Sequence, residues 1–235
     1  MKKFLIALFA LAYLGAQAQT ADEIIQKYST FMGGLDAFNK ITSAKFTGNA
    51  SVQGMDLPVI MQVLNGKGMR TDVEAMGQQV VNAYGNGKGW KINPFNGAET
   101  ATEVTGAELA SFKNQASLAN NLMDYKARGH KVEYAGEATV EGVKTYKLVL
   151  TSKDDNKPTT YYIVQSDYSL LKTVTSREMM GQEMEVETLY SDLKTFGNVK
   201  FAMHATQSAG GNVFQEISWS KIELNVPIDE KIFSM

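Results

Sequence analysis

The sequence predicts a mainly β protein with some α-helix, in which helices cover the concave side of a curved antiparallel sheet. Three observations support this prediction. Apolar and polar residues alternate with a period of two along most of the chain, glycine-containing turns separate these runs, and helical spacing replaces the alternation between Thr105 and Arg128. A sheet of so many strands curls, and helices beside it can close over the concave face.

The first residues have the pattern of a secretory signal peptide. Lys2 and Lys3 precede an apolar run from Phe4 to Leu14, and Ala16-Gln17-Ala18 is a small-x-small cleavage site. The run is shorter than the roughly 20 apolar residues of a spanning helix, which argues against an uncleaved membrane anchor. We therefore expect cleavage after Ala18 and a soluble periplasmic protein.

Composition limits the remaining possibilities. The chain has 235 residues and no cysteine, so it can neither form a disulfide nor carry a lipid on a cysteine. Residues 19–235 suit a single domain with an ordinary hydrophobic core. Without residues 1–18 the chain has 21 Lys and Arg against 25 Asp and Glu, a net charge of about −4. With no basic tract, nucleic acid is not an expected partner.

A short amphipathic helix is predicted to open the domain, because apolar residues recur at helical spacing before the glycine pair Gly33-Gly34. The residues of this apolar face are Ile24, Ile25, Tyr28, Phe31 and Met32.

From about Ser43 the pattern predicts half-buried strands. Gly66-Lys67-Gly68 and Gly85-Asn86-Gly87 suit the tight turns of an antiparallel meander. The alternating apolar positions of the first strands are Leu57, Val59, Met61 and Val63, then Met69, Thr71, Val73 and Ala75. Later strands are predicted at 146–150, 161–164, 170–175, 184–190, 200–207 and 213–224.

Residues 105–128 are predicted to form one or two helices. Thr105 with Glu108 resembles a capping box, and Gly129 is a helix stop. Leu118 and Leu122 are four residues apart, so we expect them to share one helical face pointing into the curl of the sheet. The apolar residues at helical spacing are Leu109, Phe112, Leu118, Leu122 and Tyr125.

Three segments resemble the LolA/LolB superfamily of lipoprotein carriers. Gly87-Lys88-Gly89-Trp90-Lys91-Ile92-Asn93-Pro94-Phe95 is similar to a carrier's G-K-x-x-W-x-x-N-P-F segment, with one residue fewer between lysine and tryptophan. Tyr190-Ser191-Asp192-Leu193-Lys194, and Asn225-Val226-Pro227-Ile228-Asp229 with Phe233, look like the terminal strands of outer-membrane lipoprotein-sorting proteins. The resemblance implies a half-open antiparallel barrel, roofed by helices, whose apolar cavity shelters acyl chains across the periplasm.

The resemblance also implies roles for particular residues. Arg70 matches a strand arginine that holds the helical lid closed, although it shares its strand face with Asp72 and Glu74 and a surface ion pair is the alternative. Trp90 and Phe95 either line the cavity or anchor the lid as core aromatics. The candidate cavity and lid residues are Met61, Val63, Met69, Trp90, Phe95, Leu109, Phe112, Leu118, Leu122 and Met123.

The methionines fit an adaptable cavity or an ordinary core equally well, since thioether side chains fill irregular apolar space. The chain has twelve, including Met55, Met61, Met69, Met76, Met123, Met179, Met180 and Met184.

The resemblance implies a periplasmic carrier or chaperone that binds acyl chains for transfer to the outer membrane. Expected partners are acylated lipoproteins or lipids, an inner-membrane donor and an outer-membrane acceptor, with the carrier itself a monomer. The alternative is a lipid- or lipoprotein-sensing envelope-stress domain of the same fold.

An envelope hydrolase is the less favoured alternative. The sequence contains no H-E-x-x-H, G-x-S-x-G or P-loop motif, and we expect no catalytic residues, metal or cofactor. His130 and His204 are expected at the surface. Glu183 and Glu185 share a strand face and could do acid and base work, but an exposed charged strand is the commoner case.

Overall fold

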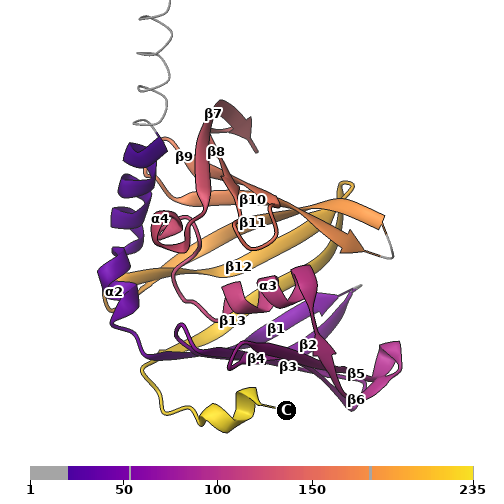
Figure 1. Cartoon of the computed structure of the whole chain (residues 1–235). Coiled ribbons are helices and arrows are strands. Elements are labelled where there is room, and N and C mark those ends of the chain that lie inside the picture. The colour runs from indigo at the N-terminus through magenta and orange to yellow at the C-terminus, as the bar shows by residue number, and fades with distance from the viewer. Residues whose placement is uncertain (1–20, 53, 180–181, 235) are drawn as a thin grey trace, which may run out of the picture.

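The computed structural model describes residues 21–52, 54–179 and 182–234. Within them, thirteen strands form one antiparallel sheet in the order β6-β5-β4-β3-β2-β1-β13-β12-β11-β10-β9-β8-β7 (Figure 1). The sheet is a meander of two arms that meet where β1 pairs with β13, and β6 and β7 are its edges. The predicted curved antiparallel sheet is confirmed.

Most strands agree with the alternating segments of the sequence, whereas the two edge strands, β6 and β7, were not predicted. The first arm contains β1 (Ser43–Val52), β2 (Met55–Leu64), β3 (Gly68–Ala75), β4 (Gln78–Gly85), β5 (Lys88–Asn93) and β6 (Ala98–Val104). The second contains β7 (Lys131–Val140), β8 (Val143–Thr151), β9 (Pro158–Val164), β10 (Leu170–Met179), β11 (Gln182–Phe196), β12 (Val199–Ala209) and β13 (Asn212–Leu224).

Two glycine-dependent features shape the sheet. The β4–β5 turn has Asn86 at φ 52° and Gly87 at φ 78°, the left-handed pair that a two-residue hairpin favours. The register of β1 against β13 shifts at Thr47 and Gly48. A Cβ on Gly48 would lie 2.0 Å from the carbonyl oxygen of Ser218, so only glycine fits this irregularity, which lies where the two arms join.

The helices lie between the arms and beside them. Residues 21–32 form the predicted N-terminal helix, which ends at Gly33. The other helical elements are α2 (Leu35–Asn39), α3 (Gly106–Gln115), α4 (Tyr125–Arg128) and the 3₁₀ turns η1 (Pro94–Asn96) and η2 (Glu230–Phe233).

The segment between β6 and β7 contains two helices, but it departs from the prediction in detail. Thr105 is the N-cap of α3 without a side-chain capping bond, and Glu108 instead binds Lys91 at 2.8 Å, so the predicted capping box is wrong. Gly129 ends α4 at φ 74°, as predicted.

Leu118 and Leu122 do not share a helical face, because residues 117–124 are not helical. In this segment, side-chain oxygens accept hydrogen bonds from backbone N–H groups that would donate to backbone carbonyls in a helix. Asn65 Oδ1 accepts from the Leu118 N–H at 3.0 Å, and Asn120 Oδ1 accepts from the Leu122 N–H at 3.1 Å. Short polar side chains of this kind compete with helix formation.

The apolar core lies mainly on the concave face. One cluster joins the N-terminal helix and α2 to β8, β9 and β12, and includes Tyr28, Phe38, Leu122 and Leu148. A second surrounds Phe46 on β1. We use "the roof" for residues 21–39 and 116–128, which cover this face.

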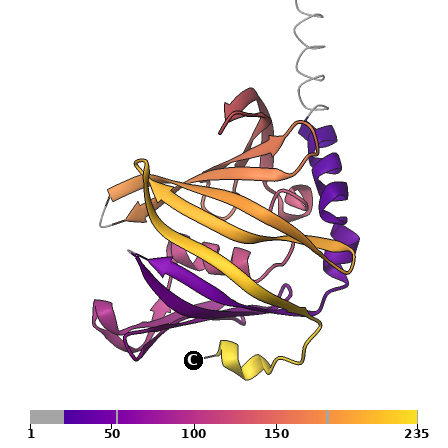
Figure 2. The same cartoon turned by 180° about the vertical axis from the view of Figure 1, so that it is seen from behind.

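The opposite face of β3, β4 and β5 is covered by the C-terminal strap, residues 225–234 (Figures 1 and 2). Phe233 is buried there, and a Cβ on either Gly68 or Gly85 would lie 2.7 Å from its side chain. Residues 225–229 are not a strand, so the expected likeness of Asn225–Asp229 to a terminal strand is wrong.

Some predictions concern residues that the structure does not describe. The signal peptide, residues 1–18, and Met180 lie outside the described residues. In residues 21–52, 54–179 and 182–234, no helix is long and apolar enough to cross a membrane.

Candidate functional site

A cavity of about 250 Å³ lies between the roof and the concave side of the sheet. Its lining is mostly aliphatic and aromatic, with Lys200 as the charged residue, and such walls bind apolar ligands with little directional demand. The lining residues are Tyr28, Met32, Phe38, Phe46, Leu118, Asn120, Met123, Leu170, Tyr190, Leu193, Lys200, Phe201, Ala202, Ala205 and Trp219.

Aromatic rings brace the floor of the cavity. The rings of Phe46 and Phe201 meet edge to face, with centroids 5.6 Å apart at 85°. Phe46 also contacts Trp219 at 5.4 Å, and Phe38 of the roof meets Phe201 edge to face at 5.6 Å. These contacts restrict ring rotation, so the floor is preformed.

The polar groups in the lining are bonded within the protein. Tyr28 Oη accepts from Asn120 Nδ2, and Tyr190 Oη lies 3.3 Å from Thr173 Oγ1. Burial raises the pKa of both tyrosines, so they stay neutral at physiological pH. Lys200 Nζ donates to the Phe31 carbonyl at 2.9 Å, at the end of the N-terminal helix. These polar groups of the lining therefore already have hydrogen-bond partners within the protein and need none from a ligand.

Asn65, in the β2–β3 turn, connects the sheet to both parts of the roof. Its Nδ2 donates to the carbonyls of Phe38 (3.0 Å) and Ile41 (2.8 Å), and its Oδ1 accepts from the Leu118 N–H. Asn65 was not among the predicted site residues. An asparagine before Gly66-Lys67-Gly68 predicts only a turn, and its partners are distant in the sequence.

A second connection joins the N-terminal helix to α4. Asp22 accepts hydrogen bonds from Lys126 Nζ at 2.6 Å and from Tyr125 Oη. The hydrogen bond from Lys126, followed by that from Tyr125, lowers the pKa of Asp22, so this carboxylate stays charged.

Arg128 holds the non-helical part of the roof together. Its Nε donates to Asp124 at 2.6 Å, and its two terminal nitrogens donate to Asn121 (3.0 Å) and Ser117 (2.7 Å). Side chains, in place of a helical backbone ladder, thus maintain the shape of residues 117–124.

The predicted cavity residues divide between cavity and core. Leu118 and Met123 line the cavity. Leu122, Val63 and Met69 are fully buried core residues, and Met61 packs against the cluster around Phe46. Phe112 is buried on α3, and it and Leu109 both approach Gly89 of β5. Four further lining residues were not among the predicted ones: Phe46, Phe201, Ala205 and Trp219.

Arg70 and Trp90 lie on the opposite face and contact the C-terminal strap. Arg70 donates to the Ile232 carbonyl at 3.2 Å and pairs with Asp72 at 2.7 Å, while Trp90 Nε1 donates to the Phe233 carbonyl at 3.0 Å. Since Gly89 faces α3, strand alternation turns Trp90 away from the cavity. Phe95 is 51% exposed in η1.

The residues that could do catalysis are dispersed. His130 was expected at the surface, but it is buried, and its Nδ1 accepts from the Lys153 N–H of the 152–157 loop at 3.0 Å. His204 Nδ1 lies 2.8 Å from Ser218 Oγ. Glu183 is exposed and paired with Lys157. No group of three or more potential metal ligands occurs in the part of the chain that the structure describes.

A larger hollow of about 390 Å³ lies between α2 and the β11–β12 turn. Asp36, Lys40, Asn198 and Asn225 contribute to its lining. Apolar residues such as Phe196 and Leu224 line it as well, but the described residues of its wall lack the cluster of packed aromatic rings that forms the floor of the 250 Å³ cavity, so we assign the apolar site to that cavity.

No protein-family model and no curated protein matches this sequence. Solved structures do share its fold. A LolA superfamily protein from Nitrosomonas europaea has 11% identity and a TM-score of 0.60, over 92% of this chain and 97% of that one. A putative outer membrane lipoprotein-sorting protein domain from Vibrio parahaemolyticus has 11% identity and a TM-score of 0.59, over 90% and 95%. A DUF1329 family protein from Desulfovibrio piger has 12% identity and a TM-score of 0.59, over 91% and 97%. The chain has a LolA-like fold.

Proposed function

We propose that this LolA-like protein is a periplasmic carrier that binds acyl chains of lipoproteins or lipids and transfers them to the outer membrane. The observation that carries the proposal is the apolar cavity between the aromatic floor and the roof. The putative outer membrane lipoprotein-sorting protein domain from Vibrio parahaemolyticus has the same fold, which supports the choice of cargo. The proposal includes export directed by residues 1–18 and action as a monomer between donor and acceptor proteins in the two membranes.

Burial of methylene groups would drive binding, at about 0.8 kcal/mol for each one removed from water. The cavity volume of about 250 Å³ is below the roughly 300–1,000 Å³ of most small-molecule sites. A whole acyl chain therefore requires the roof to move. Residues 117–124 suit that movement because side chains such as Asn65 and Arg128 hold them, without a helical ladder.

Filling the cavity tests the proposal. Ala205 lines it, so Ala205→Phe should place a ring in the space that the ligand needs and weaken binding of a fluorescent fatty acid more than tenfold. Ala135→Phe, at an exposed position on β7, is the matched control and should bind like the wild type. Both variants are melted in parallel to verify folding.

Failure of the wild-type protein to bind the probe, or equal binding by both variants, would refute the proposed site. Binding without transfer to acceptor vesicles would favour the lipid-sensing alternative over the carrier.

A further inference from the structure

Exposed apolar side chains gather at the turns of one end of the sheet. Among the described residues, we use "the apolar rim" for Met55, Met76, Phe95 and Val213, with exposed fractions of 40%, 76%, 51% and 57%. They lie at the β1–β2, β3–β4, β5–β6 and β12–β13 connections. All four connections lie on the right in Figure 1 and on the left in Figure 2, with the β12–β13 connection above the other three.

The opposite end of the sheet has polar turns. They contain Asn65-Gly66-Lys67, Asn86-Gly87, Glu141-Gly142 and Gly197-Asn198. Within the described residues, the exposed large apolar residue beside these turns is Val143, at 36%. Turns are usually polar, so the rim is the unusual end.

Met76 is the residue of the rim whose presence is hardest to explain if no other surface contacts it. It has φ 51°, a left-handed conformation that disfavours most side chains with a Cβ, and its side chain is largely in water. In the described part of the chain, four of the six other non-glycine residues with this backbone are Asn or Asp, whose type tolerates it, and the remaining two are Glu141 and Tyr168. Neither backbone preference nor solvation favours methionine here, whereas contact with an apolar surface would.

We propose that the apolar rim docks on a lipid surface with zwitterionic head groups. Four apolar residues on separate connections suit a bilayer interface, which accepts each tip individually, better than a protein partner, which needs a continuous patch. The exposed carboxylates of Asp56, Glu74 and Glu99 adjoin the rim and disfavour an anionic bilayer.

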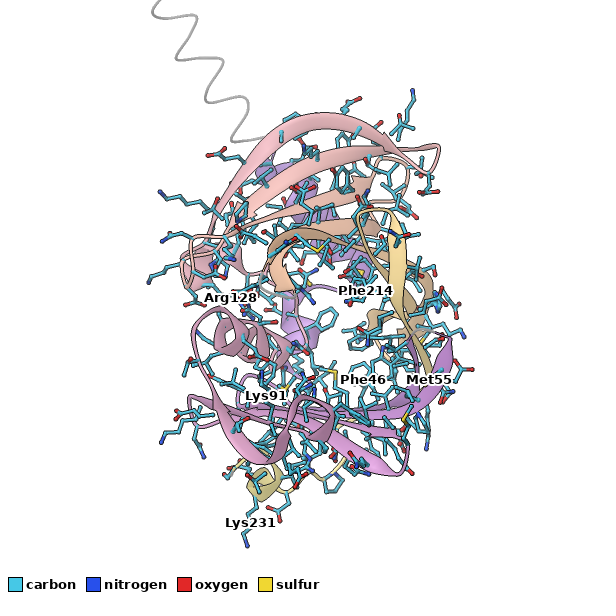
Figure 3. All side chains as sticks on the ribbon, turned by 90° about the vertical axis from the view of Figure 1, so that its right-hand side faces the viewer. Phe46, Met55, Lys91, Arg128, Phe214 and Lys231 are labelled. Atoms are coloured by element: carbon cyan, nitrogen blue, oxygen red, sulfur yellow. The ribbon has the colours of Figure 1, made fainter. Side chains whose placement is uncertain are left out.

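The rim also lies toward the open side of the concave face. Figure 3 looks onto this side and shows Met55 of the rim together with Phe46, a residue of the cavity floor. Docking by the rim would turn the concave face toward the membrane. The inference rests on residues outside the cavity lining, so it stands or falls separately from acyl-chain binding.

The test measures co-sedimentation with phosphatidylcholine vesicles. Met76→Asn and Phe95→Ser should each weaken binding about tenfold, since each removes a large apolar side chain from the interface. Val143→Asn, at the other end of the sheet, is the matched control and should bind like the wild type. Met76→Asn should melt no lower than the wild type, because asparagine tolerates the left-handed backbone.

Replacing part of the phosphatidylcholine with phosphatidylglycerol should weaken wild-type binding. The proposal is overturned if the wild type does not bind vesicles, if all variants bind equally, or if Met76→Asn abolishes self-association and leaves vesicle binding unchanged. Fatty-acid probe binding by Met76→Asn should be normal. If the wild type binds vesicles but not the probe, the proposed docking by the rim is supported and the proposed acyl-chain binding in the cavity is refuted.

Discussion

The two faces of the β1–β6 arm are both covered by other parts of the chain, but in different ways. On one face, Phe233 of the C-terminal strap fills the space left by Gly68 and Gly85, and Trp90 and Arg70 bind the strap's carbonyls. On the concave face, α3 packs on β3, β4 and β5. Where this face continues into the second arm, the roof is held by polar side chains and leaves a cavity of about 250 Å³.

The difference shows that apolar content alone does not make a binding site. Both faces carry large buried aromatic residues, such as Trp90 on one and Phe46 on the other. Glycines paired in register, Gly68 with Gly85, let the strap pack directly on the sheet. Braced rings of Phe46 and Trp219 occupy the floor on the concave side, so space remains beneath the roof.

The largest expected effect tests whether the cavity beneath the roof extends as far as Leu122, or whether the core is tightly packed there. Leu122 is fully buried in the core cluster beneath the roof. Leu122→Asp should destabilise the fold by more than about 4 kcal/mol, because an unpaired charge would be buried, and thermal melting should show gross unfolding. The control is Asn121→Asp, which adds the same charge beside Arg128 and should melt near the wild type. A folded Leu122→Asp protein that fails to bind the probe would instead place Leu122 in the ligand site.

The strap gives the second largest effect. Phe233→Ala removes a buried ring and should cost about 3–5 kcal/mol of the free energy of unfolding, measured by denaturant titration. Probe affinity should not change under conditions in which the variant is folded, because the strap covers the face away from the cavity. Phe233→Leu should lose less stability. A changed probe affinity would mean that the two faces are coupled.

Asn65 tests the attachment of the roof. Asn65→Ala should destabilise the fold by about 1–3 kcal/mol, since it leaves two carbonyls and one N–H without their partner. Amide hydrogen exchange at Leu118 should accelerate, and the fatty-acid probe should enter faster. Asn39→Ala, at an exposed position at the end of α2, is the control. Unchanged exchange at Leu118 would show that other contacts hold the roof.

Arg70 gives the smallest expected effect and separates the two faces most directly. Arg70→Leu should cost about 1 kcal/mol, because it removes one hydrogen bond to the strap and a partly exposed ion pair with Asp72. The release rate of the probe should equal that of the wild type. Slower release would restore a role for Arg70 in holding the lid.

Much of the fold was predictable from local patterns. Alternation located most of the strands, although not the edge strands β6 and β7, and helical spacing located residues 21–32. Glycine marked the ends of that helix and of α4. The candidate site was predicted less well, since only Leu118 and Met123 of the ten cavity and lid candidates line the cavity. Alternation shows which residues share a strand face. It does not show which face is concave, and Trp90 fell on the other one.

The sequence by itself determined the antiparallel meander and its turns, because these depend on residue periodicity and on backbone conformations that Asn86 and Gly87 adopt readily. Only the tertiary structure decided the shape of the roof and the position of the cavity. Those depend on contacts between distant residues, such as Asn65 with Leu118 and Phe38 with Phe201. Such contacts are chosen by the packing of the whole chain, so no local pattern records them.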